Sequence, residues 1–267
     1  MSRLHRTAAA IVFGVLAVGS AATARAQVTG MPLFTNPRFG TGIRIHGDIG
    51  QPTDQGTQPG NLTVIQGGVT LAIGPVGIGA NVGALKNSIS SLQQCKSGVI
   101  TSCNPQTKVT GSGLLQLKLM GGGINPLSLS LFGGASMDVS AFDIAKYGYH
   151  PTTAVDSAFV RAFQDSIGVK ELTIPVGAAI GLHIPLIFTS LNVWGAPRYT
   201  FHKFSNCGTS NSTLCSKTTG SFRWAAGVDI PILWVISLRA AYDSGEIDNK
   251  TVSYWGVGAS IGLGGMR

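Results

Sequence analysis

Apolar residues alternate with glycine or polar residues along much of this chain. The clearest stretch is 76–85, where Val76, Ile78 and Val82 share one set of alternate positions and Gly77 and Asn81 share the other. Successive side chains of a β-strand point to opposite faces of the sheet. The spacing therefore predicts strands with one apolar face and one glycine-rich or polar face.

The alternation predicts ten strands. They are expected at 38–49, 62–73, 76–86, 110–121, 127–139, 172–184, 187–201, 220–230, 232–243 and 252–263. Tight connections (74–75, 122–126, 185–186 and about 231) alternate with longer polar ones (50–61, 87–109, 140–171, 202–219 and 244–251), so all long loops are expected at one end. Helical spacing of apolar residues at 153–166, inside the longest loop, predicts a short helix that plugs the mouth or packs loop residues.

The two faces of these strands differ in chemistry. One face is apolar, as at Leu115, Leu117 and Leu119. The other carries the charged positions, which by parity are Arg44, His46, Asp48, Lys118, Asp138, His183, Arg198, Arg223, Asp229, Arg239 and Asp243. A water-soluble sandwich keeps its apolar face inside and its charges in water. The pattern instead favours an all-β, closed antiparallel transmembrane barrel with lipid outside and a polar lumen.

Composition supports this interpretation. Only 11% of the 267 residues are charged, whereas a soluble domain carries about 25%. Glycine is abundant, at 37 residues, without a collagen-like period. After the N-terminus no uninterrupted apolar run reaches the roughly 18 residues that a membrane-spanning helix needs. A helical membrane protein is therefore not expected.

The N-terminus has the features of an export signal. Arg3 and Arg6 precede the apolar stretch 8–22, and Ala24-Arg25-Ala26 is a small-residue cleavage site. Residues 1–26 are expected to be removed, 27–37 to form a short lead, and 38–267 to form the barrel with its extracellular loops. Removal of three arginines lowers the net charge from +8.

Aromatic residues are expected to collect at the two membrane interfaces. The larger group lies near the loop ends of the strands, on the outward face: Tyr199, Phe201, Phe222, Trp224, Tyr242 and Trp255. Phe39 and Trp234 are expected to play the same part at the turn end.

With these features, residues 38–263 resemble the small bacterial outer-membrane β-barrel proteins of the OmpA, OmpX and OmpW kind. The resemblance implies a closed antiparallel barrel in the outer membrane of a Gram-negative cell, in contact with outer-membrane lipid.

The inward charges form the candidate functional site: Arg44, Asp48, Lys118, Asp138, Arg198, Arg223, Arg239 and Asp243. A hairpin centred on residue 231 would place Arg223 opposite Arg239, where like charges repel unless Asp243, Asp48, Asp138 or a bound anion compensates. A structural salt-bridge network is favoured, and an anion-selective passage is the alternative. Glycines also gather on the inward face, where the missing side chains leave room for long arginines or for water.

The four cysteines form two local pairs, Cys95/Cys103 and Cys207/Cys215, each within a long loop. An exported protein meets oxidising conditions, so two structural disulfides are predicted. The spacing does not suit zinc, and no metal or cofactor is expected.

Catalysis is not expected. Resemblance to the ten-stranded omptin proteases would require an Asp pair and an Asp/His pair at the rim, and only His46-Gly47-Asp48 is similar. No G-x-S-x-G elbow is present, and no basic run with interleaved aromatics suggests nucleic acid. Two functions stay open: a structural barrel or narrow channel for small solutes, with anions as one candidate class, and a surface adhesion or recognition protein that presents its disulfide-stapled loops to an extracellular ligand.

Overall fold

The computed structural model describes most of the chain between residues 31 and 263. The described residues are 31–53, 61–88, 95, 100, 102–122, 125–140, 169–205, 215, 217–232, 235–247 and 250–263. The predicted signal peptide (1–26), the predicted loop helix (153–166), Trp234 and Cys207 lie outside these residues. Within the described part, no helix has the length and apolar character needed to cross a membrane.

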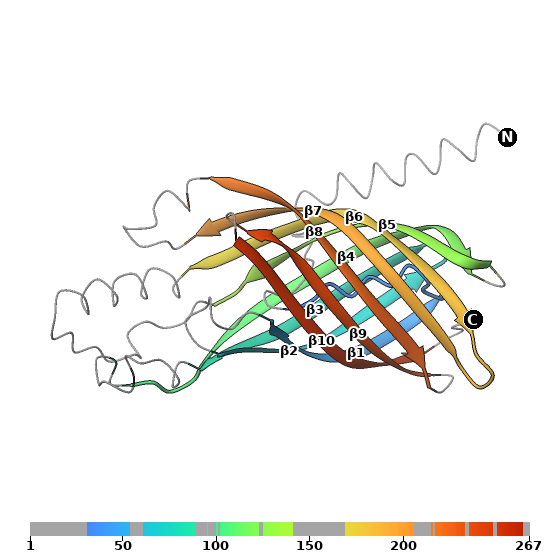
Figure 1. Ribbon diagram of the computed structural model, residues 1–267, viewed down its shortest axis with the longest axis horizontal. Helices are drawn as coiled ribbons and strands as arrows, with labels where there is room; N and C mark the ends of the chain where they lie inside the picture. The colour runs from blue at the N-terminus through green and yellow to red at the C-terminus, as the bar shows by residue number, and fades with distance from the viewer. Residues whose placement is uncertain are drawn as a thin grey trace.

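Ten antiparallel strands close into one barrel, as the alternation predicts (Figure 1). They are β1 (Gly42–Pro52), β2 (Asn61–Ile73), β3 (Val76–Ser88), β4 (Gln106–Gly122), β5 (Asn125–Asp138), β6 (Lys170–Pro185), β7 (Ser190–Ser205), β8 (Thr218–Pro231), β9 (Ile236–Ile247) and β10 (Lys250–Leu263). Each strand pairs with its sequence neighbours, and β1 pairs with β10. Closure leaves no unpaired sheet edge, which is the condition for a sheet surrounded by lipid.

The short connections gather at one end of the barrel, here called the turn end, and the long ones at the other, the loop end (Figure 1). Gly74, with φ +58°, and Pro75 form the two-residue turn between β2 and β3. Glycine is suited to this position because a side chain disfavours positive φ.

The register of β8 and β9 corrects one prediction. β9 begins at Ile236 rather than at 232, so Asp229 pairs with Arg239 and Arg223 pairs with Gly245. The predicted pairing of Arg223 with Arg239 is therefore wrong. The segment 230–236 (I-P-I-L-W-V-I) is almost continuously apolar, and such a run gives no period from which the turn can be located. Across β7 and β8, Arg223 instead lies opposite Arg198.

The outward face of the barrel is apolar throughout its middle. Val176 on β6 is 52% exposed and Ile180 is 55% exposed. Similar exposure is found on the other strands, for example at Ile45, Ile65, Ile78, Leu131, Leu238, Val257 and Ile261. Outward-facing charges such as Lys86, Lys203 and Glu246 lie toward the loop end. This distribution is the reverse of a water-soluble β-sandwich.

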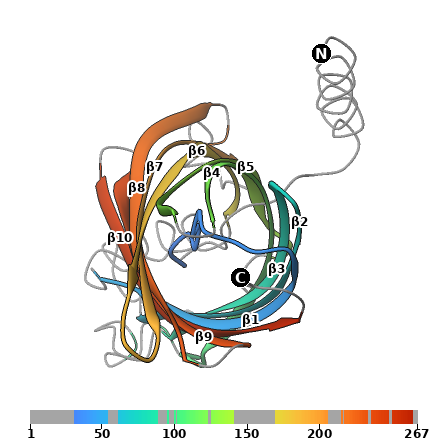
Figure 2. The ribbon, with the colours of Figure 1, turned by 90° about the vertical axis from the view of Figure 1, so that its right-hand side faces the viewer.

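Residues 31–41, here called the lumen segment, run inside the barrel before β1 begins (Figure 2). Met31 and Thr35 are fully buried, and Leu33 is 4% exposed. The predicted start of the first strand at 38 is therefore wrong, because residues 38–41 enter the lumen instead of joining the sheet. Phe39, expected at the outer surface, is likewise buried inside.

Several inward glycines make room for the lumen segment. A Cβ at Gly77 would lie 3.3 Å from the Phe39 ring. At Gly181 it would lie 2.8 Å from Pro37 Cγ, and at Gly256 it would lie 2.9 Å from Pro32 Cγ. Other inward glycines do accommodate arginines: a Cβ at Gly177 would lie 2.6 Å from Arg198 Cβ. The space left by glycine is thus filled by a chain segment as well as by side chains.

Candidate functional site

The most deeply buried charges form a cluster of two arginines and one aspartate. Arg198 Nη2 donates to Asp243 Oδ2 at 2.5 Å, and Arg223 Nη2 donates to Asp243 Oδ1 at 2.9 Å. The Asp243 side chain is 0% exposed, and the arginines are no more than 2% exposed. The backbone N–H of Leu33 also donates to Asp243, at 3.2 Å. One carboxylate thus binds β7, β8 and the lumen segment to β9.

A second ion pair joins β9 to β1. Arg239 Nε donates to Asp48 Oδ1 at 2.6 Å, and its Nη2 reaches Oδ2, so the pair is bidentate. Gln66 Nε2 donates to the same carboxylate at 2.9 Å. The Arg239 guanidinium also lies 4.4 Å from the centroid of the Phe34 ring in the lumen segment. Bidentate Arg–carboxylate geometry fixes both partners in position.

A third network lies at the loop end. Lys108 Nζ donates to Asp138 Oδ2 at 2.7 Å, and the backbone N–H of Glu171 donates to the same oxygen at 2.9 Å. Glu171 Oε1 lies 2.6 Å from His202 Nδ1. The sequence prediction missed Lys108 because it began the strand at 110, although the alternation of Lys108, Thr110 and Ser112 continues the inward face.

The pair His46 and Asp48, the only feature similar to an omptin site, is engaged in other contacts. His46 Nε2 lies 2.7 Å from Asn81 Oδ1, and Asn81 Nδ2 donates to Ser112 Oγ at 3.1 Å. Asp48 is held by Arg239 as described. These contacts join β1 to β3, β3 to β4 and β1 to β9 on the inner face of the barrel.

The lumen segment is anchored along its length by polar contacts. Gln116 Nε2 donates to the carbonyl oxygen of Asn36 at 3.1 Å, and Arg38 Nη1 donates to that of Asn125 at 2.7 Å. Lys118 Nζ donates to the Phe39 carbonyl and lies 4.8 Å from the centroid of the Phe39 ring. Strand parity placed Lys118 and several glycines on the inward face, but it did not predict the segment that they contact.

An apolar cluster adds to these contacts inside the barrel. It contains one residue of the lumen segment and residues of the lumen wall: Leu33, Phe132, Ala179, Trp194, Ala196, Ala225 and Ala241. Phe34 packs against it. Trp194 also donates its indole N–H to Asp229 Oδ2 at 2.8 Å. The lumen therefore contains a packed core around its central segment.

Space beside the lumen segment is limited in the middle of the barrel. Two cavities there, lined in part by Phe34, Leu114 and Arg239, have volumes of about 60 Å³ and 50 Å³. Such volumes hold a few water molecules. A larger cavity of about 280 Å³ lies at the turn end, where Arg38, Lys118 and His183 contribute to its wall.

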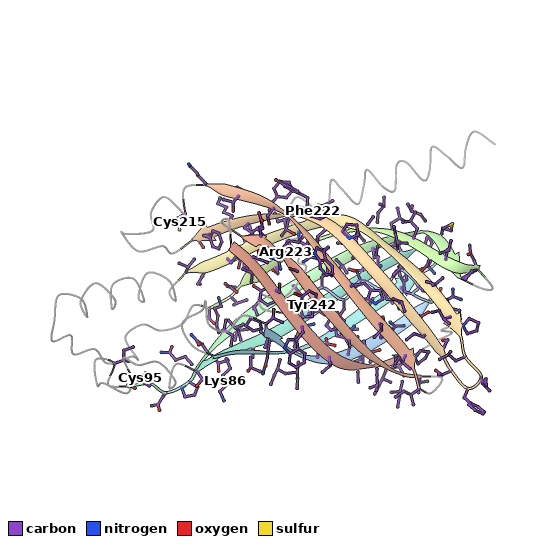
Figure 3. The ribbon with its side chains drawn as sticks, viewed as in Figure 1. Lys86, Cys95, Cys215, Phe222, Arg223 and Tyr242 are labelled. Carbon is purple, nitrogen blue, oxygen red and sulfur yellow. A yellow bond between two sulfur atoms is a disulfide. The ribbon has the colours of Figure 1, made fainter. Side chains whose placement is uncertain are left out.

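Aromatic side chains mark the loop-end rim on the outer surface. Tyr199 and Phe201 pack edge to face with centroids 5.1 Å apart, and the Trp224 and Tyr242 centroids are 5.6 Å apart. Phe222 is 62% exposed, whereas the adjacent Arg223 is 2% exposed (Figure 3). The strand thus places an aromatic ring outside and a charge inside at the same height.

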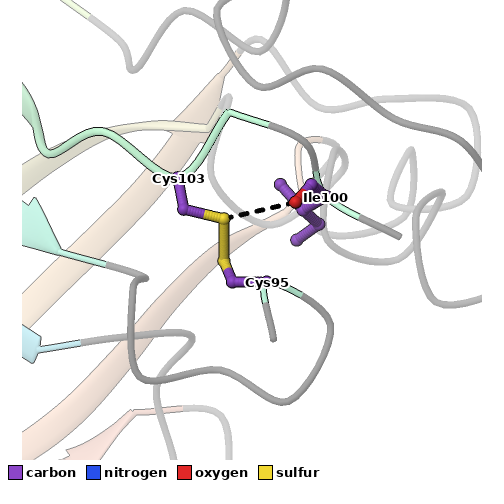
Figure 4. Close-up of a disulfide and its surroundings, with 3 residues drawn as sticks. All are labelled: Cys95, Ile100 and Cys103. Atoms are coloured by element: carbon purple, nitrogen blue, oxygen red, sulfur yellow. Dashed lines mark hydrogen bonds between the residues drawn. A yellow bond between two sulfur atoms is a disulfide. The ribbon is translucent and has the colours of Figure 1, made fainter. Parts of the chain in front are cut away.

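The disulfide predicted between Cys95 and Cys103 is present in the connection between β3 and β4 (Figure 4). Cys103 Sγ lies 3.4 Å from the carbonyl oxygen of Ile100. Cys215 is disulfide-bonded as well. Among the described residues, no group of three or more His, Cys, Asp or Glu side chains is arranged to hold a metal ion.

No protein-family model matches the sequence, and no curated protein matches it. Among solved structures, the barrel is similar to the translocator domain of autotransporter NalP from Neisseria meningitidis, with 15% identity, a TM-score of 0.43, and coverage of 83% of this chain and 88% of that chain. It is similar to the β domain of the Bordetella autotransporter BrkA, with 9% identity, a TM-score of 0.47, and coverage of 84% and 100%. It is also similar to the outer membrane protease OmpT from Escherichia coli, with 8% identity, a TM-score of 0.36, and coverage of 84% and 98%. The names of these three proteins differ in the role that they state.

Proposed function

We propose that this chain is a non-catalytic outer-membrane β-barrel whose lumen is kept closed by its own lumen segment. The observation that carries the proposal is the position of residues 31–41 inside the lumen (Figure 2), with Leu33 held by Asp243 and Phe39 held by Lys118. Export by the signal sequence 1–26 would bring the chain to the outer membrane. Its role there is structural and surface-exposed while the segment stays in place.

The test is the single-channel conductance of refolded residues 27–267 in a planar bilayer. Protein that shows the heat-modifiable migration of a folded barrel is expected to produce no steady openings, because ions meet the packed segment. Frequent steady openings of the intact chain would overturn the closed barrel. They would favour instead a narrow channel whose anion preference is set by Arg198, Arg223 and Arg239.

The membrane assignment gives a separate prediction. Ile180→Arg places a charge at the middle of the apolar outer face and is expected to lower the free energy of unfolding in lipid by about 2–4 kcal/mol. Val109→Arg, outward-facing near the loop end, serves as the matched control and is expected to have an effect of about 0–1 kcal/mol. Urea unfolding in vesicles measures both. Equal effects of the two variants would contradict the position of the apolar belt.

A second candidate function is surface recognition, favoured by the Cys95–Cys103 disulfide. A disulfide across a loop of this length lowers the conformational entropy of the unfolded chain and so stabilises the folded loop by roughly 2–3 kcal/mol. A loop held in one conformation would present a fixed surface to a ligand. The double variant Cys95→Ser/Cys103→Ser is expected to keep the heat-modifiable barrel and to lose adhesion to host cells or matrix. Adhesion that is absent from the wild-type protein, or unchanged in the variant, would count against this role.

A further inference from the structure

The cavity at the turn end combines an opening toward solvent with an excess of positive charge. Arg38 and Arg44 reach it from the lumen segment and β1, Lys118 from β4, and His183 from β6. Among the lining residues that the structure describes, Asp229 is the one carboxylate. We call this cavity the turn-end vestibule (Figure 2 views the barrel from this end).

The single carboxylate is buried and shared. Asp229 is 6% exposed and accepts the Trp194 indole N–H at 2.8 Å. It also interacts electrostatically with Arg44 and Arg239, and Arg239 is the register partner of Asp229 on β9. By contrast, Arg38, Lys118 and His183 are only partly buried. The charge that a solute meets in the vestibule is therefore positive.

The contacts of these groups hold them in fixed positions. Arg38 is oriented by the Asn125 carbonyl, Lys118 by the Phe39 carbonyl and ring, and His183 by Asn192, whose Oδ1 lies 2.7 Å from His183 Nδ1. These groups come from the lumen segment, β4, β6 and β7, so the fold brings residues from distant parts of the sequence to one cavity. Prearranged donors bind an anion without a large loss of side-chain entropy.

From this arrangement we propose that the turn-end vestibule is a binding site for a small phosphate-bearing anion. Among the described lining residues, three permanent cations face one carboxylate, a balance that matches a dianion better than a halide. Arginine and lysine together supply the forked and point-charge donors that phosphate oxygens accept. The volume of about 280 Å³ is at the small end of ligand sites and excludes a polymer. The site rests on the same lumen segment as the closed-barrel proposal, but titration measures binding and not conductance, so the two proposals can fail separately.

The test is isothermal titration of refolded residues 27–267 with pyrophosphate in a neutral detergent at low ionic strength. Saturable binding at one site is expected, and added salt should weaken it. Arg38→Gln and Lys118→Gln are each expected to weaken binding roughly ten- to hundredfold, the effect of one charge-assisted hydrogen bond. Lys118→Arg retains the charge and is expected to retain binding.

The matched control is Lys203→Gln, which removes one positive charge from the exposed outer face near the loop end. Heat-modifiable migration confirms that each variant is folded before titration. Absence of saturable binding to the wild-type protein would overturn the proposal. So would an equal loss in Lys203→Gln, because binding would then follow net charge and not this site.

A further arm separates the two sources of phosphate. A short-chain phosphatidic acid, added below its micelle concentration, competes with pyrophosphate if the vestibule takes a lipid headgroup. Failure to compete identifies a free phosphate solute as the occupant. With either occupant, the proposal requires that Arg38→Gln and Lys118→Gln weaken pyrophosphate binding as described above.

Discussion

Removal of residues 27–37 is expected to convert a silent barrel into one that conducts ions steadily. The truncation leaves all ten strands intact, since β1 begins at Gly42, and takes away Leu33, Phe34 and Asn36 from the centre of the lumen. The glycines that face the segment then border open space. Planar-bilayer recording compares refolded residues 38–267 with refolded residues 27–267 and measures the change in conductance.

A substitution in the wall offers a test on the full-length chain. Gly256→Leu would drive a side chain into Pro32, and Gly181→Leu would drive one into Pro37; both are expected to displace the lumen segment and produce openings. Gly195→Leu is the matched control, because a Cβ at Gly195 meets no atom within 4 Å.

The truncation has its own contradicting outcome. If residues 38–267 show heat-modifiable β-structure but no conductance, the lumen segment is not what closes the barrel, and the side chains of the wall close the lumen by themselves.

Asp243→Asn is expected to be the most destabilising single substitution of the lumen charges. Arg198 and Arg223 both donate to this carboxylate in a fully buried position. Loss of one partner of a buried ion pair costs about 3–5 kcal/mol, because the remaining charge is left uncompensated. Urea unfolding in detergent, followed by tryptophan fluorescence, measures the free energy of unfolding.

Two further variants give this prediction its controls. Glu246→Gln removes an exposed carboxylate from the same strand and is expected to change stability by less than about 1 kcal/mol. Joint replacement of Arg198, Arg223 and Asp243 by Met, Met and Leu is expected to restore much of the loss, because apolar residues of similar volume need no counter-charge. An Asp243→Asn effect no larger than that of Glu246→Gln would show that the arginines are compensated elsewhere.

The inward position of the charged residues could be predicted, because the alternation of side chains between the two faces of a strand is a local property. Arg198, Arg223 and Asp243 each occupy an inward position in a strand whose other face is apolar, and period two is legible within one strand. Which carboxylate meets which guanidinium is not local. It depends on the register between strands, and the β8–β9 register was misplaced because the apolar run around Pro231 hides the turn.

Local sequence patterns predict the ten strands, their two faces and the alternation of short and long connections, because each depends on the spacing of neighbouring residues. The occupant of the lumen, by contrast, is set by long-range contacts. Residues 31–41 have no alternation and no helical period, and their place is set by contacts with residues far along the chain, such as Gln116, Gly181 and Asp243. These contacts join residues far apart in the sequence, so no local pattern predicts them.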